Sequence, residues 1–323
     1  MSKGDVVVLG ITGHIGRAAA LAFAAAGWSV RGMVRREAPL LPDVTFERGD
    51  AASLADLQRV IGPADIVVNA LNLPYHQWDQ GRFEAQLARV ITAMGSTGKA
   101  MLFPGNIYNF RAGDRDVTPD SPQHPQTPRG GIRVRLEQML AAAAERGDIQ
   151  AIVLRAGDFY GPNSHGDWFE QGVLSAVRKG VVQRLGPPAV GHSWAYLPDL
   201  GRAFEHLAAL RRSLGAFERF HFAGHFVTHA QLTDAIRAAA PVPLKVKDFP
   251  HWIMPLLGLG SPLLRELGKM SYLWRNTMEL VDPRLAALLG PQFGTPFEAA
   301  IAATIAPYFN TAVRGKTMAT APA

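Results

Sequence analysis

The chain has 323 residues, of which 48% are hydrophobic and 19% charged, and it contains no cysteine. The apolar fraction excludes a disordered chain, and the lack of cysteine excludes disulfide scaffolds, thiolate metal sites and cysteine nucleophiles. The net charge is +6, but the basic residues are scattered, so no nucleic-acid partner is expected. No apolar run is long enough to cross a bilayer, and a strand-like segment follows the N-terminus directly. We therefore expect a cytoplasmic protein without signal peptide or integral membrane association.

The first half of the chain alternates between strand-like and helix-like segments. Short apolar runs predict buried strands, and the Ala-rich or amphipathic stretches between them predict helices. The predicted elements are strand 6–9, helix 15–26, strands 30–34 and 44–46, helix 54–61, strand 66–68, helix 83–94, strand 100–103, helix 133–145 and strand 152–154. This alternation predicts an α/β fold, a doubly wound parallel sheet of the Rossmann type with helices on both faces.

After Gly161, proline and glycine interrupt the pattern. One more strand is predicted at 220–222, and a capping box at 228–231 opens a helix over 231–239. We expect a smaller, mostly helical C-terminal substrate lobe. Residues 1–160 and 193–224 are assigned to the sheet domain, 161–192 and 225–310 to the lobe, and 311–323 to a flexible tail. The apolar segment 252–264 is interpreted first as a roof over the substrate pocket, then as a homodimer contact, then as a membrane-surface contact.

The strongest motif is a glycine-rich turn between the first predicted strand and helix, Gly10-Ile11-Thr12-Gly13-His14-Ile15-Gly16. Gly10 permits a tight turn, Gly13 lets the backbone approach a pyrophosphate, and Gly16 lets the helix pack closely on the strand. The helix N-terminus offers N–H groups and its positive dipole end to the phosphates. The motif predicts dinucleotide binding; the alternative is a glycine-rich turn without a ligand.

The end of the second predicted strand indicates which dinucleotide binds. An NAD site places an acidic residue there, on the ribose 2′-hydroxyl, whereas this sequence has Arg35 and Arg36. Guanidinium groups suit a 2′-phosphate, so we predict NADP; the alternative is two solvated arginines. Asp50, after the third strand, is interpreted either as an acceptor for the adenine amino group or as a helix N-cap.

Four segments together resemble the extended short-chain dehydrogenase/reductase family, in its NAD-dependent epimerase/dehydratase branch. They are the glycine turn, Gly49-Asp50, the LRAGDFYGP sequence at 154–162 and the SWAYLPD sequence at 193–199. The likeness covers roughly residues 6–224. It implies a dinucleotide-binding Rossmann domain, in which Arg35 and Arg36 make NADP the expected cofactor. The predicted cofactor contacts are Gly10, Thr12, Gly13, His14, Ile15, Gly16, Arg35, Arg36, Asp50, Ala51, Ala70, Leu71, Asn72 and Arg133.

The family's catalytic residues are missing from this sequence. The resemblance implies a Ser or Thr after the fifth strand and a Tyr-x-x-x-Lys pair on the next helix. By spacing, Pro104 stands at the hydroxyl position, Arg129 at the Tyr position and Arg133 at the Lys position. A guanidinium stays protonated and cannot act as an acid/base in place of a phenol. The chain therefore resembles an atypical member lacking the Tyr-x-x-x-Lys pair.

Two functions remain open at this point. The first is an NADP-dependent oxidoreductase or isomerase whose acid is Tyr108, with Arg133 holding the ribose hydroxyls. The alternative role for Tyr108 is packing. The second function is a non-catalytic NADP(H)-binding redox sensor, like the NmrA-type members of the family.

Aromatic and polar residues in loops at the strand ends predict the substrate contacts. Such loops bind ligands in open α/β sheets, and the absence of clustered Arg or Lys favours an uncharged, partly apolar small molecule over a nucleotide sugar. For any single aromatic residue the alternative is a place in the core. The histidines at 221, 225 and 229 share no helical face, so no metal site is expected. The candidate substrate residues are Tyr75, His76, Trp78, Asp158, Tyr160, His165, Trp168, His192, Trp194 and Tyr196.

Overall fold

A seven-stranded parallel sheet forms the larger part of the molecule. The computed structural model describes residues 2–74, 77–162, 164, 166–251 and 268–309. The strand order is β11-β7-β5-β4-β1-β2-β3. The chain winds outward from β1 in one direction and then, from β4, in the other, so the prediction of a doubly wound Rossmann sheet is confirmed. The strands are β1 (Asp5–Leu9), β2 (Ser29–Val34), β3 (Val44–Arg48), β4 (Ile66–Asn69), β5 (Ala100–Asn106), β7 (Gln150–Ala156) and β11 (Phe217–Phe222).

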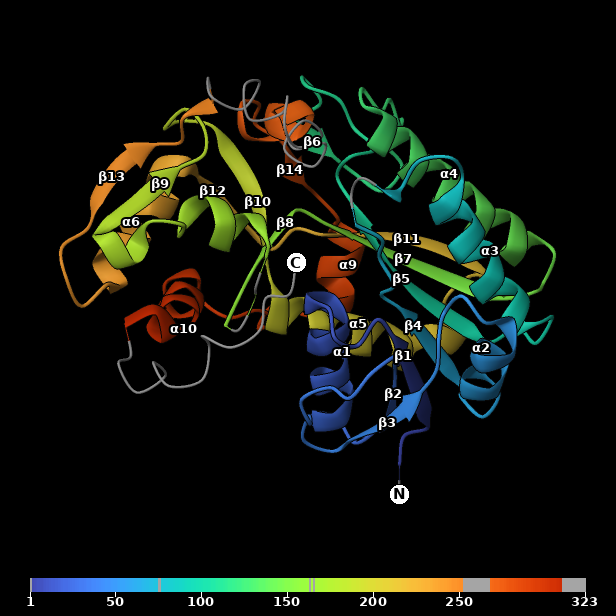
Figure 1. The fold of residues 1–323 in the computed structure, drawn as a ribbon. Coiled ribbons are helices and arrows are strands. Elements are labelled where there is room, and N and C mark those ends of the chain that lie inside the picture. The colour runs from blue at the N-terminus through green and yellow to red at the C-terminus, as the bar shows by residue number, and fades with distance from the viewer. Residues whose placement is uncertain (1, 75–76, 163, 165, 252–267, 310–323) are drawn as a thin grey trace.

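Helices cover both faces of this sheet (Figure 1). Helices α1 (His14–Ala25) and α5 (Leu197–Leu210) bury Phe23 and Phe204 against one face. On the other face lie α2 (Leu54–Ile61), α3 (Arg82–Met94) and α4 (Pro128–Glu145). A Cβ on Gly201 of α5 would lie 2.4 Å from the carbonyl oxygen of Ala18 in α1. That glycine therefore permits the close approach of the two helices.

The predicted elements of the first half are all present, most within two residues of their predicted ends. The largest difference is α4, which begins at Pro128 instead of residue 133. Two glycines follow Pro128 and lower the helix propensity of this stretch. The Thr127 side chain nevertheless caps the helix by accepting a hydrogen bond from the Gly130 N–H, and Pro128 occupies a first-turn position that suits proline.

The C-terminal lobe contains small sheets as well as helices. One sheet joins β8 (Asp158–Tyr160), β10 (Gly191–Tyr196) and β12 (His225–Thr228), and a second joins β9 (Val181–Arg184) to β13 (Lys245–Asp248). Helices α6 (His229–Ala239) and α10 (Phe297–Phe309) pack with them. The predicted capping box is confirmed, with Thr228 accepting from the Gln231 N–H and the Gln231 side chain from the Thr228 N–H. Residues 193–196, assigned to the Rossmann domain from the sequence, belong to this smaller sheet.

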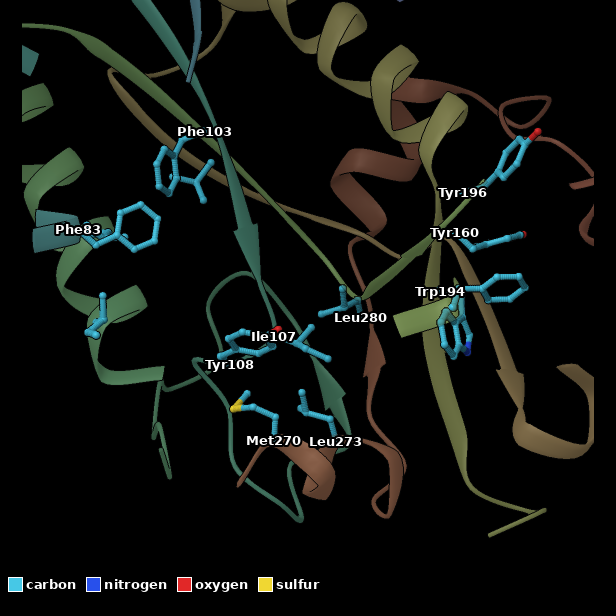
Figure 2. Packing of buried hydrophobic residues seen from close by; sticks show 14 of the residues in the cluster. Phe83, Phe103, Ile107, Tyr108, Tyr160, Trp194, Tyr196, Met270, Leu273 and Leu280 are labelled. Carbon is cyan, nitrogen blue, oxygen red and sulfur yellow. The ribbon is translucent and has the colours of Figure 1, made fainter. Parts of the chain in front are cut away.

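Aromatic side chains along β8 and β10 extend the buried core of the sheet domain into the lobe. Figure 2 shows Tyr160, Trp194 and Tyr196 grouped there, whereas Tyr108 lies beside Ile107 at the end of β5. Tyr160 packs against both Tyr196 and Phe169 with ring centroids 5.3 Å apart. Helix α9 (Pro283–Leu289) and the short β6 (Asp116–Val117) and β14 (Glu279–Leu280) connect the lobe to the sheet domain. No helix in the described part of the chain has the length and apolarity to span a bilayer.

Candidate active site

The glycine turn has the conformation that its sequence predicts. Gly10 has φ +78°, and a Cβ there would lie 2.5 Å from the Ala70 carbonyl oxygen. A Cβ on Gly16 would lie 2.2 Å from the Gly10 carbonyl oxygen. At both positions any side chain would collide with backbone. Gly13 differs, because a Cβ there would meet only the Gly10 oxygen, at 3.4 Å. The space above Gly13 is therefore open toward a ligand.

The N-terminus of α1 is suited to a phosphate group. Gly13 is its N-cap and supplies no capping side chain, and no acidic residue stands in the first turn. The first N–H groups of a helix have no partner within the helix and carry its positive dipole end. An open glycine in front of these N–H groups fits a dinucleotide pyrophosphate.

The end of β2 leaves two guanidinium groups in solvent. Arg35 and Arg36 are exposed and have no hydrogen-bond or ion-pair partner among the described residues. Asp50 lies after β3, where its side chain accepts a hydrogen bond from the Ala52 N–H. The interpretation of Asp50 as an N-cap was wrong: Ser53 caps α2, with its hydroxyl accepting from the Asp56 N–H.

A cavity of about 350 Å³ begins at the glycine turn and extends over the carboxyl ends of β4, β5 and β7. This is the edge at which ligands bind in doubly wound sheets. Residues predicted as cofactor, catalytic and substrate contacts line it together: His14, Ile15, Ala70, Leu71, Asn72, Trp78, Tyr108, Arg133, Asp158 and Trp168. The remaining predicted cofactor residues, Gly10, Thr12, Gly13, Gly16, Arg35, Arg36, Asp50 and Ala51, do not line this cavity.

Arg129 and Arg133, one turn apart on α4, have different surroundings. Arg129 is buried, and its two terminal nitrogens each lie 3.0 Å from an oxygen of Asp79. Arg133 lines the cavity and donates to the Pro104 carbonyl at 3.3 Å. Its guanidinium carbon lies 4.7 Å from the ring centroid of Trp78. Aromatic stacking holds Arg133 beside the strand end, while the ion pair turns Arg129 toward Asp79.

The backbone of Tyr108 is held both at its N–H group and at its carbonyl group. Its N–H donates to the Asn106 side chain at 3.0 Å, and its carbonyl oxygen would lie 2.1 Å from a Cβ on Gly130. The absence of a side chain at Gly130 therefore lets the first turn of α4 press directly on Tyr108. The Tyr108 ring is 7% exposed and lines the cavity.

A buried polar network lies beneath this edge. Arg155 of β7 is fully buried and makes two hydrogen bonds to Glu137 of α4, at 2.8 and 2.5 Å. Its third nitrogen lies 2.9 Å from Nε2 of His221, whose Nδ1 lies 2.9 Å from the Val117 carbonyl oxygen. Burial and the neighbouring Arg155 charge lower the pKa of His221 to about 3. The network ties β7, β11 and α4 together below the cavity.

Asp158 forms part of the cavity wall. Its Oδ2 lies 3.0 Å from Nε2 of His192 and accepts a hydrogen bond from Nε1 of Trp274 at 2.8 Å. Trp168, also in the wall, packs edge-to-face against Trp274 with ring centroids 4.4 Å apart. His192 itself is fully buried behind Asp158 and does not line the cavity.

Three more of the predicted substrate residues lie away from this cavity. Tyr160 and Trp194 are fully buried in the aromatic core of the lobe (Figure 2). The Tyr160 hydroxyl is 2.7 Å from Nδ1 of His225, and burial raises its pKa above the usual value. Tyr196 lines a separate cavity that also includes His225. The hydrophobic effect places these rings in the core, the alternative that the sequence left open for each of them.

Several residues of the cavity wall were not predicted. Asn69 and Asn106 close the buried strands β4 and β5, and a polar residue at the end of an apolar strand is the signal that could have found them. Asp167, in the turn before Trp168, accepts hydrogen bonds from the Ser164 hydroxyl and the Glu170 N–H. Burial raises the pKa of its carboxyl group. The other unpredicted polar and aromatic lining residues are Phe103, Phe159 and Gln171.

Some sequence predictions fall outside the described residues: those for Tyr75, His76 and His165, for the roof segment over 252–264 and for the tail. The three spaced histidines each have a separate partner: His221 bonds to Arg155 and Val117, His225 to Tyr160 and Thr295, and His229 to Trp274.

Comparison with known proteins identifies the family. The family model for the NAD-dependent epimerase/dehydratase family matches residues 6–220. The chain belongs to this family. No curated protein sequence matches it significantly.

Solved structures, epimerases among them, share the fold along nearly the whole chain. MoeE5 in complex with UDP-glucose and NAD has a TM-score of 0.73 at 20% sequence identity, covering 94% of this chain and 97% of its own. A putative epimerase from Burkholderia cenocepacia has a TM-score of 0.74 at 17% identity, covering 94% and 97%. UDP-glucose 4-epimerase from Brucella ovis in complex with NAD has a TM-score of 0.71 at 17% identity, covering 95% and 98%. At these identities the likeness shows the fold alone.

Proposed function

We propose that the protein binds NADP(H) and uses it as an oxidoreductase or epimerase-type enzyme acting on a small, partly apolar molecule. The observation that carries this proposal is the continuity of the site. One cavity runs from His14 and Ile15, at the start of α1, to the strand ends, where Tyr108, Arg133 and Asp158 line it. When bound, a nicotinamide dinucleotide supplies hydride transfer.

The cofactor end is supported by the backbone. The uncapped first turn of α1 and the bare Gly13 fit the pyrophosphate. Arg133, held between Trp78, Phe83 and the Pro104 carbonyl, is positioned to donate to ribose hydroxyls. MoeE5 and the Brucella ovis epimerase were both solved with NAD, which supports a nicotinamide dinucleotide in this family.

The choice of NADP over NAD rests on Arg35 and Arg36. Both are exposed at the end of β2, with no described partner that would occupy them. We expect Arg35→Ala to weaken NADPH binding by about tenfold, the effect of one charge-assisted contact to phosphate, and to leave NADH binding unchanged. Calorimetric titration of both nucleotides measures this, with the exposed Arg237→Ala as a charge-matched control. Equal binding of NADH and NADPH by the wild type would overturn the assignment.

For catalysis we propose that Tyr108 supplies or orients a proton at the strand ends. It lines the cavity, whereas Arg129, at the position of the family's catalytic Tyr, is engaged with Asp79. We expect Tyr108→Phe to lower kcat by about a hundredfold, the usual contribution of a positioned acid, with NADPH affinity unchanged. A screen of small carbonyl and enone substrates with NADPH supplies the assay. Undiminished turnover in Tyr108→Phe would remove Tyr108 from this role.

The second candidate function is a non-catalytic NADP(H)-binding redox sensor. The ion pair between Arg129 and Asp79 favours it, because a buried guanidinium replaces an acid/base at that position. A sensor binds NADPH and NADP⁺ with different affinities and turns over no substrate. Tight binding combined with a negative substrate screen would favour it.

A further inference from the structure

The Asp158 carboxylate is held on one side only. Oδ2 is engaged by His192 Nε2 and by the Trp274 indole N–H, whereas Oδ1 has no hydrogen-bond partner among the described residues. The residue is 6% exposed and lines the cavity. Because Asp158 lines the cavity and His192 and Trp274 engage Oδ2, Oδ1 is the oxygen left for a ligand there. A nearly buried carboxylate with one unsatisfied oxygen is costly unless a ligand supplies the missing donor.

The surroundings of Oδ1 indicate which donor that is. Trp274 positions both Asp158 and Trp168, because it donates a hydrogen bond to Asp158 and packs its ring against Trp168. A carboxylate oxygen beside an indole is a combination that binds protonated amines through a charge-assisted hydrogen bond and cation–π attraction.

The other charged groups of the cavity agree with this selection. Asp167, in the same wall as Trp168, has its two oxygens engaged by Ser164 and by the Glu170 N–H. The basic groups His14 and Arg133 belong to the turn and the strand end where the cofactor is proposed to bind. Apart from Arg133, the described lining carries no Arg or Lys, and its carboxylates are those of Asp158 and Asp167.

We propose that the substrate carries a primary amino group, bound as the ammonium ion by Asp158 Oδ1 against Trp168. This inference rests on the proposed function, because it concerns the substrate end of that same cavity. It replaces the expectation of an uncharged molecule by that of a cation, and it sets this chain apart from MoeE5, which was solved with the anionic UDP-glucose. A diphosphate would meet the Asp158 carboxylate with like charge.

Asp158→Asn tests the proposal with little disturbance to the fold. The amide oxygen can still accept from His192 and Trp274, and the NH2 group then points into the cavity. The substitution thus replaces a hydrogen-bond acceptor by a hydrogen-bond donor at the position of Oδ1. The control, Asp234→Asn, removes one carboxylate from an exposed i,i+3 pair on α6.

The probes are benzylamine, benzyl alcohol and benzoate, titrated by calorimetry at neutral pH with and without NADPH. For the wild type we expect benzylamine to bind at least about tenfold more tightly than benzyl alcohol. Asp158→Asn should lose that preference and gain affinity for benzoate, while Asp234→Asn should behave as the wild type. Thermal melting verifies that each variant is folded.

The outcomes separate this inference from the proposed function. Benzyl alcohol binding as tightly as benzylamine to the wild type, or an unchanged amine preference in Asp158→Asn, would overturn the amine proposal even if NADPH binds. Failure of NADPH to bind would overturn the proposed function, and the titrations without nucleotide would still report on Asp158.

Discussion

The two ends of the cavity are built in different ways. The glycine end comes from consecutive residues, and its geometry depends on backbone atoms and on the missing side chains of Gly10, Gly13 and Gly16. The substrate end comes from distant segments: Asp158 begins β8, Trp168 is the N-cap of a short helical segment, and Trp274 is more than 100 residues further along. Short-range geometry can be read from a motif, whereas a site assembled by side chains depends on the packing beneath it.

The largest expected effect comes from the buried network below the substrate end. We predict that Glu137→Ala lowers the free energy of unfolding by about 3–5 kcal/mol, because it leaves the fully buried Arg155 without its carboxylate. Urea unfolding measures this. Glu218→Ala breaks an ion pair with Arg284, whose side chain is 55% exposed, and should cost at most about 1 kcal/mol. Equal losses in the two variants would show that the Arg155 network does not support the site.

Substitutions at two glycines of the turn should affect stability and NADPH binding differently. We predict that Gly16→Ala lowers the free energy of unfolding by about 1–3 kcal/mol, because its Cβ would overlap the Gly10 carbonyl. Gly13→Ala should change stability by less than about 1 kcal/mol, since its Cβ meets one atom at contact distance. It should still abolish tight NADPH binding, because the methyl group occupies the space proposed for the pyrophosphate. Unfolding curves and calorimetry on both variants decide this, and normal NADPH binding by Gly13→Ala would contradict the proposed phosphate site.

The last expected effect is a pH dependence of stability carried by two buried histidines. Burial is the main cause that lowers the pKa of His221 to about 3 and that of His229 to about 4, from an ordinary value of 6.5. Below about pH 6.5 these two histidines therefore bind protons in the unfolded chain but not in the folded chain. Each histidine then makes stability fall with falling pH, down to its folded pKa, by at most about 1.4 kcal/mol per pH unit.

Replacing one histidine isolates its contribution to the pH dependence of stability. Between pH 6 and pH 4.5 we expect the unfolding free energy of His229→Gln to fall less steeply than that of the wild type. The difference in slope should correspond to roughly one bound proton. Unfolding free energies at several pH values measure the slope. Identical slopes would mean that His229 is protonated in the folded state.

The sequence by itself determined the Rossmann sheet, most of its element boundaries and the glycine turn. Each of these follows from local rules: apolar runs form buried strands, and only glycine tolerates the contacts at Gly10 and Gly16. These local rules did not predict the early start of α4. There the cap at Thr127 and the contact of Gly130 with Tyr108 outweigh a low helix propensity.

Only the tertiary structure decided which candidate residues meet at the cavity. Asp158, Tyr160, His192, Trp194 and Tyr196 look alike as loop or strand-end residues in the sequence. Strand alternation does not separate them, because Asp158 and Tyr160 share one face of β8 and His192, Trp194 and Tyr196 share one face of β10. The burial of large aromatic surfaces places Tyr160 and Trp194 in the core. Asp158 faces the cavity, because His192 and Trp274 engage it from behind. That choice depends on contacts across 34 and 116 residues, which no local pattern encodes.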